Sequence, residues 1–155
     1  MNGLCGRFAA AVLTVCLAAL FRPAAFGEET ARLGTTDLHI EVSGVKSTKG
    51  VVQYAVFDSP RHFPSRIGRV AKGEVPASSP KTEIVVKGLR PGTYAVAIFH
   101  DENRNDDFDQ GIFGIPLEDY GFSNNVMGFF SAPDFDDAKF AVSGLHTTIS
   151  IKISR

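Results

Sequence analysis

The residues best suited to chemistry form an acidic, oxygen-rich stretch at positions 100–109. Side chains that carry carboxylate or amide oxygens recur there at every second position: Asp101, Asn103, Asn105, Asp107 and Asp109. A hard cation such as Ca²⁺ takes about six to eight oxygen ligands, and a short loop supplies several of them when such side chains alternate. The spacing therefore predicts a calcium-binding loop in which the ion has a structural role.

Alignment with an EF-hand loop assigns a role to each of these positions. Asp101, Asn103 and Asn105 would occupy the first three ligand positions, Asp107 would offer its backbone carbonyl, and Asp109 would bind directly or through water. Because so many oxygens come from one segment, little open coordination would remain for catalysis. We therefore expect such an ion to fasten the loop.

Two positions depart from the EF-hand pattern. Asp106 replaces the glycine that forms the sharp turn, and Ile112 stands where the bidentate glutamate is expected. The segment that follows offers three replacements for this glutamate: Glu118, Asp119 and Asp134. The alternative interpretation needs no metal, since Asn and Asp side chains also form turns by bonding to their own backbone.

A hydrolytic site is a second interpretation of the same region. It would use His100, Asp101 or Asp109 around Ser123 as the nucleophile. A serine nucleophile needs a base and an oxyanion site close by, and the sequence indicates neither. The alternation of the preceding strand instead places His100 at the rim of a packed face, bonded to a loop carbonyl. The sequence thus contains no convincing catalytic constellation.

A candidate contact surface follows the acidic stretch. The aromatic side chains of residues 120–125 would stack on a sugar or peptide while the amides bond to it; alternatively, the aromatics anchor the loop and the asparagines satisfy buried backbone groups. Phe129 and Phe130 form a candidate aromatic patch for a partner, or else part of a hydrophobic cluster under the loop. The candidate ligand or partner surface comprises His100, Tyr120, Phe122, Ser123, Asn124, Asn125, Phe129 and Phe130.

Short apolar or alternating runs must position these residues. They lie at 38–43, 51–57, 70–75, 82–86, 93–99, 136–142 and 147–153, with turn-forming residues between them. Such runs predict an all-β chain, an antiparallel β-sandwich of about seven strands with immunoglobulin- or prealbumin-like architecture. A closed barrel is the alternative. Residues 110–135 have no regular period but many aromatics, which favours one long ordered loop over disorder.

The first 27 residues are typical of a signal peptide. Arg7 precedes a thirteen-residue apolar run at 8–20, and small residues at Ala25 and Gly27 predict cleavage near Gly27. The run is too short for a comfortable membrane span, so we expect no transmembrane segment in the mature chain. Residues 28–35 would be a flexible lead-in and residues 36–155 one β-sandwich domain, periplasmic or secreted.

Cleavage would also change the charge and the cysteine content. Both cysteines, Cys5 and Cys16, would be lost, which excludes disulfides and thiol chemistry from the mature chain. Of 16 Lys and Arg residues, Arg7 and Arg22 precede the cleavage point, so 14 remain against 17 Asp and Glu, a net charge of −3. This balance gives no electrostatic reason to expect nucleic acid as a partner.

Several ordered motifs resemble a known family. They lie at 52–57, 89–96, 100–103, 114–116 and 120–125. Together they resemble the bacterial domain-of-unknown-function family 2141 over roughly residues 36–154. The resemblance implies a small exported protein without an established activity, and residues 89–94 also resemble a turn of prealbumin-like and collagen-adhesin B-type sandwiches. Asp106 departs from this family's loop, where a glycine is more usual.

We therefore expect an exported, non-enzymatic binding, adhesion or envelope accessory module. Its 100–135 loop, fastened by a structural calcium ion, would present the contact surface to a protein, peptide or glycan of the cell envelope. The alternatives are a small periplasmic hydrolase using His100 and Asp101 near Ser123, and a structural subunit of an envelope complex.

Overall fold

The computed structural model describes residues 34–128 and 131–155. The expected signal peptide, both cysteines, most of the lead-in, and Phe129 and Phe130 therefore lie outside the described residues. In the described ranges, no helix is both long and apolar enough to cross a membrane.

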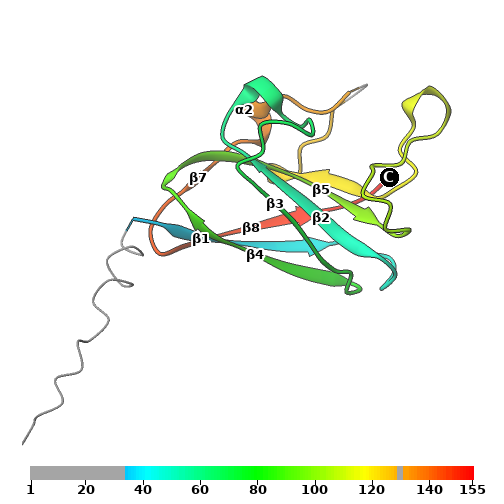
Figure 1. Cartoon of the computed structure of the whole chain (residues 1–155), viewed down its shortest axis with the longest axis horizontal. Coiled ribbons are helices and arrows are strands. Elements are labelled where there is room, and N and C mark those ends of the chain that lie inside the picture. Colours follow the sequence, from blue (N-terminus) through cyan, green and yellow to red (C-terminus); the bar gives the residue numbers. More distant parts are fainter. Residues whose placement is uncertain (1–33, 129–130) are drawn as a thin grey trace, which may run out of the picture.

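Eight strands in the described part of the chain form two sheets that pack face to face (Figure 1). The strands are β1 Thr36–Ser43, β2 Val51–Phe57, β3 Ala71–Pro76, β4 Lys81–Leu89, β5 Gly92–Asp101, β6 Tyr120–Phe122, β7 Phe140–Val142 and β8 His146–Lys152. One sheet has the order β4-β1-β8, and the other has the order β3-β2-β5-β6, with β7 also paired to β5. This arrangement confirms the predicted all-β sandwich.

One strand pair departs from the predicted antiparallel arrangement. β1 and β8 run parallel, with Leu38 opposite Thr147 and Ile40 opposite Ile149, whereas the other ladders are antiparallel. Alternation of apolar residues fixes which face of a strand is buried, but it carries no information on the direction of the neighbouring strand. The positions of most strands were therefore accessible from the sequence, whereas this pairing was not.

The main hydrophobic core lies between the two sheets. Alternate residues of facing strands supply it, among them Leu38, Ile40, Val42, Val52, Val56, Ile84, Val96, Ile98 and Ile151, all of which are almost completely buried. Burial of each such aliphatic side chain contributes about 1.5–3 kcal/mol. The side chains between them on β1, such as His39 and Glu41, point to solvent, as a half-buried strand requires.

A second apolar cluster covers part of the outer face of the five-stranded sheet. Phe57, Ala95, Phe135 and Ala138 are buried there. Phe63, from the loop after β2, packs edge to face on Phe57 and Phe135 with ring centroids 5.3 and 5.8 Å apart. β2 and β5 are apolar on both faces because each face of this sheet is covered over part of its length.

Two elements differ from the predicted pattern. The strand predicted at 136–142 is divided into a short helix, α2 Phe135–Ala138, and β7, and the helix has Asp136 and Asp137 in its first turn, where negative charge is favourable. Within the segment predicted as irregular, β6 pairs with β5, with Tyr120 opposite Phe99 and Phe122 opposite Ala97. A three-residue strand is too short to show a period of two.

The two sheets are joined at one edge. Tyr120 of β6 and Ser154, just after β8, exchange two backbone hydrogen bonds of 3.2 and 3.0 Å. Gly121 allows this approach, since a Cβ atom at that position would lie 2.7 Å from the carbonyl oxygen of Lys152. The junction holds residues 117–120 at the end of the sandwich that carries the acidic stretch.

Candidate functional site

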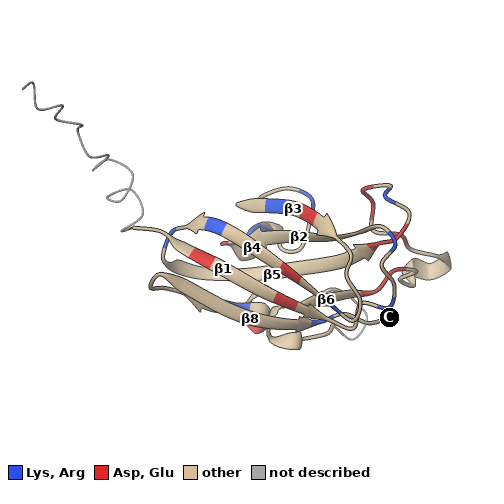
Figure 2. Cartoon of the chain, turned by 90° about the horizontal axis from the view of Figure 1, so that it is seen from below, with Lys and Arg blue, Asp and Glu red and all other residues tan. Residues whose placement is uncertain are grey.

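The acidic loop begins at the end of β5, where a buried carboxylate organises it. Figure 2 shows acidic residues gathered on the loops at the end of the sandwich that carries the C-terminus. Asp101 is completely buried, and its Oδ1 accepts the N–H of Asn105 at 3.2 Å. Its Oδ2 accepts the N–H of Asp106 at 3.0 Å and Nε2 of Gln53 at 2.9 Å. The loop thus folds around the Asp101 side chain.

The other predicted ligands form a network around the same turn. Oδ1 of Asn103 accepts the N–H of Asn105 at 3.1 Å, and Oδ1 of Asn105 accepts the N–H of Asp107 at 2.9 Å. The amide nitrogens of Asn103 and Asn105 donate to the two carboxylate oxygens of Asp109 at 2.8 and 2.9 Å. The structure therefore brings together Asp101, Asn103, Asn105 and Asp109 through hydrogen bonds.

The Asp107 side chain turns away from this network. It forms an ion pair with Arg66 of the loop after β2, and the same guanidinium donates to the carbonyl oxygen of Asp106 at 2.6 Å. The Asp107 carboxylate is thus engaged elsewhere, which is compatible with the predicted role for its backbone carbonyl. The ion pair also links two loops that lie far apart in the sequence.

The sharp turn expected of a glycine is present although Asp106 occupies the position. Asp106 has a φ of +62°, in the left-handed region that glycine enters most easily and that Asp and Asn tolerate better than other residues. Its N–H donates to Asp101, and its Oδ1 accepts Nε2 of Gln53 at 3.0 Å. These two bonds hold a backbone conformation that an aspartate does not favour by itself.

Of the three candidates for the missing glutamate, Glu118 touches the loop. It is buried, and its Oε2 accepts the N–H of Asp109 at 3.0 Å. Asp119 instead pairs with Lys46 at 2.7 Å, and Asp134 precedes α2. Ile112 is 79% exposed on the arm beyond the loop, which comprises residues 110–116 and is closed by a bridge between Gln110 and Pro116. Sequence reasoning named Glu118 as one of three, and only the fold distinguishes it.

Carboxylates crowd this end of the sandwich. Burial is the main cause that raises the pKa of Glu118; the hydrogen bond from the Asp109 N–H opposes it, and the charges of Asp101 and Asp109 add smaller raising effects. In the described ranges, no Lys or Arg forms an ion pair with Asp101, Asp109 or Glu118. Nor do three His, Cys, Asp or Glu side chains of those ranges stand close enough to hold a metal ion as the loop lies here.

The residues of the hydrolase interpretation do not lie together. His100 is buried, and its Nε2 bonds to the carbonyl oxygen of Lys49 at 2.7 Å. Ser123 is also buried; its Oγ donates to the Ala138 carbonyl at 2.6 Å and accepts the N–H of Val96 at 2.9 Å. Val96 and His100 are separated by four residues, or about 13 Å, along β5. Burial also removes His100 and Ser123 from any contact surface.

The two asparagines of the candidate contact surface serve the backbone. Asn124 donates to the carbonyl oxygens of Asp137 and Lys139 at 2.9 and 3.0 Å, and the side-chain oxygen of Asn125 accepts the N–H of Lys152 at 2.7 Å. Their left-handed conformations, with φ of +61° and +56°, place them for these bonds. Their arrangement follows the alternative interpretation, in which the amides satisfy backbone groups.

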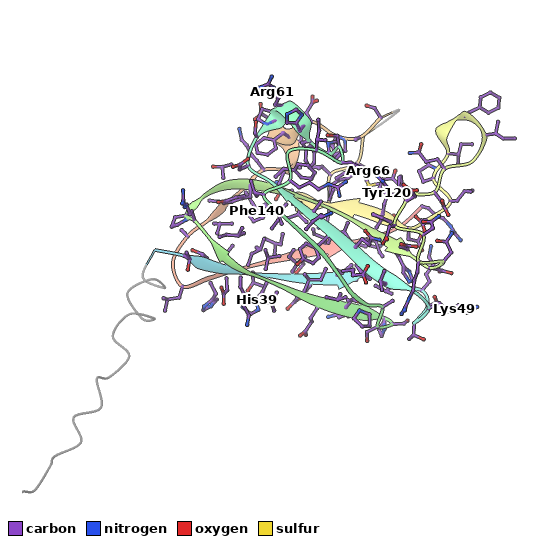
Figure 3. The ribbon with its side chains drawn as sticks, viewed as in Figure 1. His39, Lys49, Arg61, Arg66, Tyr120 and Phe140 are labelled. Atoms are coloured by element: carbon purple, nitrogen blue, oxygen red, sulfur yellow. The ribbon has the colours of Figure 1, made fainter. Side chains whose placement is uncertain are left out.

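A groove that sequence reasoning did not identify lies beside the acidic loop. It encloses about 750 Å³ on the outer face of β2, β5 and β6. Residues of these strands and of the loops after β2 and β5 line it, including Ala55, Ala97, Phe99, Phe108, Tyr120, Phe122, Arg66 and Arg69. Figure 3 shows Arg66 and Tyr120 on this side of the molecule. The sequence signal was the pair of small residues, Ala55 and Ala97, on outward positions of two central strands.

Fold and site together define an all-β sandwich protein with a carboxylate-centred loop and an adjoining groove. The model of the family described as "Uncharacterized protein conserved in bacteria (DUF2141)" matches residues 40–150, and the chain belongs to this family. The family resemblance of the sequence motifs is thereby confirmed. No curated protein and no solved structure matched the chain.

Proposed function

We propose that the protein is an exported, non-enzymatic binding module of the cell envelope whose acidic loop is fastened by a calcium-like cation. The observation that carries this proposal is that Asp101, Asp109 and Glu118 meet at one loop and form no ion pair with a Lys or Arg of the described ranges. A buried carboxylate is costly unless a positive charge or several hydrogen bonds compensate it. A cation bound at this loop would supply the missing charge.

The chemistry of the donor set suits a hard cation, and the side chains would have to move closer together to hold it. Side-chain oxygens of Asp101, Asn103, Asn105, Asp109 and Glu118 and the carbonyl of Asp107 would hold it, an all-oxygen set of the kind that Ca²⁺ prefers. The turn at Asp106 is formed, and Glu118 provides a carboxylate in place of the residue at 112. The amide bonds to Asp109 would have to open to admit the ion. When bound, the cation would neutralise the carboxylates and hold the loop closed.

The groove supports the binding role. One of its walls is built from the acidic loop, since Asp106 and Phe108 line it, and Arg66 links this wall to the opposite one. A cation that orders the loop would therefore also order one wall of the groove. The groove has the size that small ligands occupy.

The test is a melting curve of the purified protein in EDTA and then in millimolar calcium. An ion present at about a hundred times its Kd stabilises by about 2.7 kcal/mol, which corresponds to a rise of about 10 °C. Asp109→Asn should abolish the rise. Asp136→Asn, which removes an exposed carboxylate on α2, is the matched control and should retain it. Absence of a rise with calcium, magnesium or manganese would overturn the cation-fastened loop.

An accessory subunit of an envelope complex is a second candidate function. The arm beyond the acidic loop carries Phe113, which is 96% exposed, beside Ile112 and Ile115, which are 79% and 61% exposed. Such an apolar tip favours contact with another surface. Cross-linking in cells from exposed Leu117 should then capture a defined partner, and the same probe in a Phe113→Ser background should not capture it.

A further inference from the structure

The floor of the groove is hollow because two small residues lie there between larger side chains. Ala55 of β2 lies opposite Ala97 of β5 on the outer face of the sheet. Larger rings flank this pair: Phe108 contacts Phe99 and Tyr120 edge to face, with ring centroids 5.6 and 5.4 Å apart. Two methyl groups between bulky rings leave a depression, and the cluster around Phe63 closes it on the side away from the acidic loop.

The floor of the hollow is apolar, although polar side chains such as Arg66, Arg69 and Gln110 also line the groove. Two side-chain amides, Gln53 and Gln110, line the groove, and Nε2 of Gln53 is already bonded to Asp101 and Asp106. A sugar, whose hydroxyl groups each need a hydrogen-bond partner, would find few of them among the alanines and phenylalanines. The floor instead suits an apolar molecular body that gains from leaving water.

The wall opposite the acidic loop is cationic. Arg66 and Arg69 both line the groove, together with a single carboxylate, that of Asp106. Arg66 is paired with Asp107, but no carboxylate in the described ranges forms an ion pair with Arg69, whose Nε donates to the carbonyl oxygen of Ser65 at 3.2 Å. Burial, and then the charge of Arg66, lowers the pKa of Arg69. Since no ion pair in the described ranges balances the charge of Arg69, an anion placed here would supply one.

We propose that the groove binds a small amphipathic anion. Its apolar body, aromatic or aliphatic, would lie over the hollow at Ala55 and Ala97, and its single carboxylate, sulfonate or phosphate group would meet the guanidinium of Arg69. A volume of about 750 Å³ is within the usual range of small-molecule sites. This inference rests on the proposed binding function and names its ligand class, but it requires no cation.

The test uses a fluorescent pair with the same rings. Titration of the folded protein with 8-anilinonaphthalene-1-sulfonate is compared with titration by N-phenyl-1-naphthylamine, which lacks the sulfonate. Arg69→Gln should weaken sulfonate binding at least about tenfold and leave the neutral dye unchanged, since a hydrogen bond to a charged group is lost. Ala97→Leu, which fills the hollow, should weaken both dyes.

A matched control lies on the same loop. Arg61 is exposed, does not line the groove, and lies apart from Arg66 in Figure 3. Arg61→Gln should leave both titrations unchanged. Equal losses in Arg61→Gln and Arg69→Gln, or unchanged sulfonate binding in both Arg69→Gln and Ala97→Leu, would overturn the proposal. Each variant is first shown to melt cooperatively, because partly unfolded chains also bind these dyes.

Competitors distinguish two sources of the ligand. Displacement of the sulfonate by dodecanoate would support an aliphatic, lipid-like anion, and displacement by 2-naphthoate would support an aromatic one. Displacement by neither would overturn the assignment. If calcium still raises the melting temperature in that case, the cation-fastened module stands and only the ligand class fails. If the dyes bind as expected and calcium has no effect, the groove stands and the cation fails.

Discussion

At the scale of single residues, Asp101 has the largest structural effect in the loop. Its two oxygens hold three donors, and two of these are the backbone N–H groups of Asn105 and Asp106. Each such bond to a charged acceptor is worth about 1.5–3 kcal/mol. The carboxylate thereby fixes the turn at residues 105–106, which lowers the entropic cost of binding a cation there.

For Glu118 we predict that substitution by Gln raises the melting temperature in EDTA at neutral pH and lowers it in calcium. Its pKa is raised in the folded protein, so the protonated form is favoured there, and ionisation of the carboxyl costs stability as pH rises above its ordinary value of 4.5. In EDTA, Glu118→Gln should therefore melt higher than the natural protein at neutral pH and equal to it in acid. In calcium the order should reverse, because the variant loses a ligand.

Melting curves between about pH 4 and pH 8, with EDTA or calcium, measure both effects. Glu102→Gln is the control, since Glu102 is exposed on the same loop and has no bond to Asp109. If Glu118→Gln and the natural protein rose equally with calcium, Glu118 would not be a ligand.

Sequence reasoning located the acidic loop but did not single out the residues that contact it from elsewhere in the chain. Alternation at 101–109 was enough to indicate which residues share a turn, because that geometry is local. Glu118 and Gln53 reach the loop only because β6 and β2 lie beside β5, and no local pattern contains that information. The Arg66–Asp107 ion pair is non-local for the same reason.

At the scale of elements, the outward side chains of β5 lie in three different environments. Ala95 is buried in the second apolar cluster, against which Phe63 packs. Ala97 and Phe99 line the groove, and Asp101 enters the acidic loop. A strand apolar on both faces indicated that something covers it. The apolar pattern did not show that only part of the outer face is covered, since an alanine under a loop and an alanine in a groove cannot be told apart in the sequence.

The turn before β5 gives a prediction for a single hydroxyl group. Tyr94 is buried, and its hydroxyl donates to the carbonyl oxygen of Arg90 at 2.8 Å, which ties the β4–β5 turn to the strand. The Tyr94 hydroxyl is protonated at neutral pH because its ordinary pKa is 10.0, and burial, followed by the charge of Asp58, raises this pKa further. Tyr94→Phe should lower the free energy of unfolding by about 1 kcal/mol.

Denaturant titration at neutral pH measures the change. Tyr54 is the matched control: it is half-buried in β2, and no hydrogen bond of its hydroxyl is present in the described structure, so Tyr54→Phe should have almost no effect. Equal losses in the two variants would mean that the Arg90 contact contributes nothing specific.

At the scale of the whole molecule, the binding features gather where the two sheets meet. The five-stranded sheet supplies β5 and β6, and the strand β8 of the other sheet leads to Ser154, which bonds to Tyr120. Sequence patterns predicted two layers but not this junction, because a bridge formed by one residue on each side has no period. The junction nevertheless determines where Glu118 and Tyr120 lie relative to the loop and the groove.

The Ser154 backbone N–H provides a direct test of the junction. Ser154→Pro removes the N–H that donates to the Tyr120 carbonyl at 3.0 Å, whereas Ser154→Ala keeps both backbone bonds. The proline variant should lose about 1–3 kcal/mol of unfolding free energy and bind calcium more weakly, because residues 117–120 are no longer held beside the loop. Denaturant titration and calcium-dependent melting measure the two effects. Calcium affinity unchanged in Ser154→Pro would show that the loop is organised by β5 alone, and that the second sheet contributes stability without shaping the site.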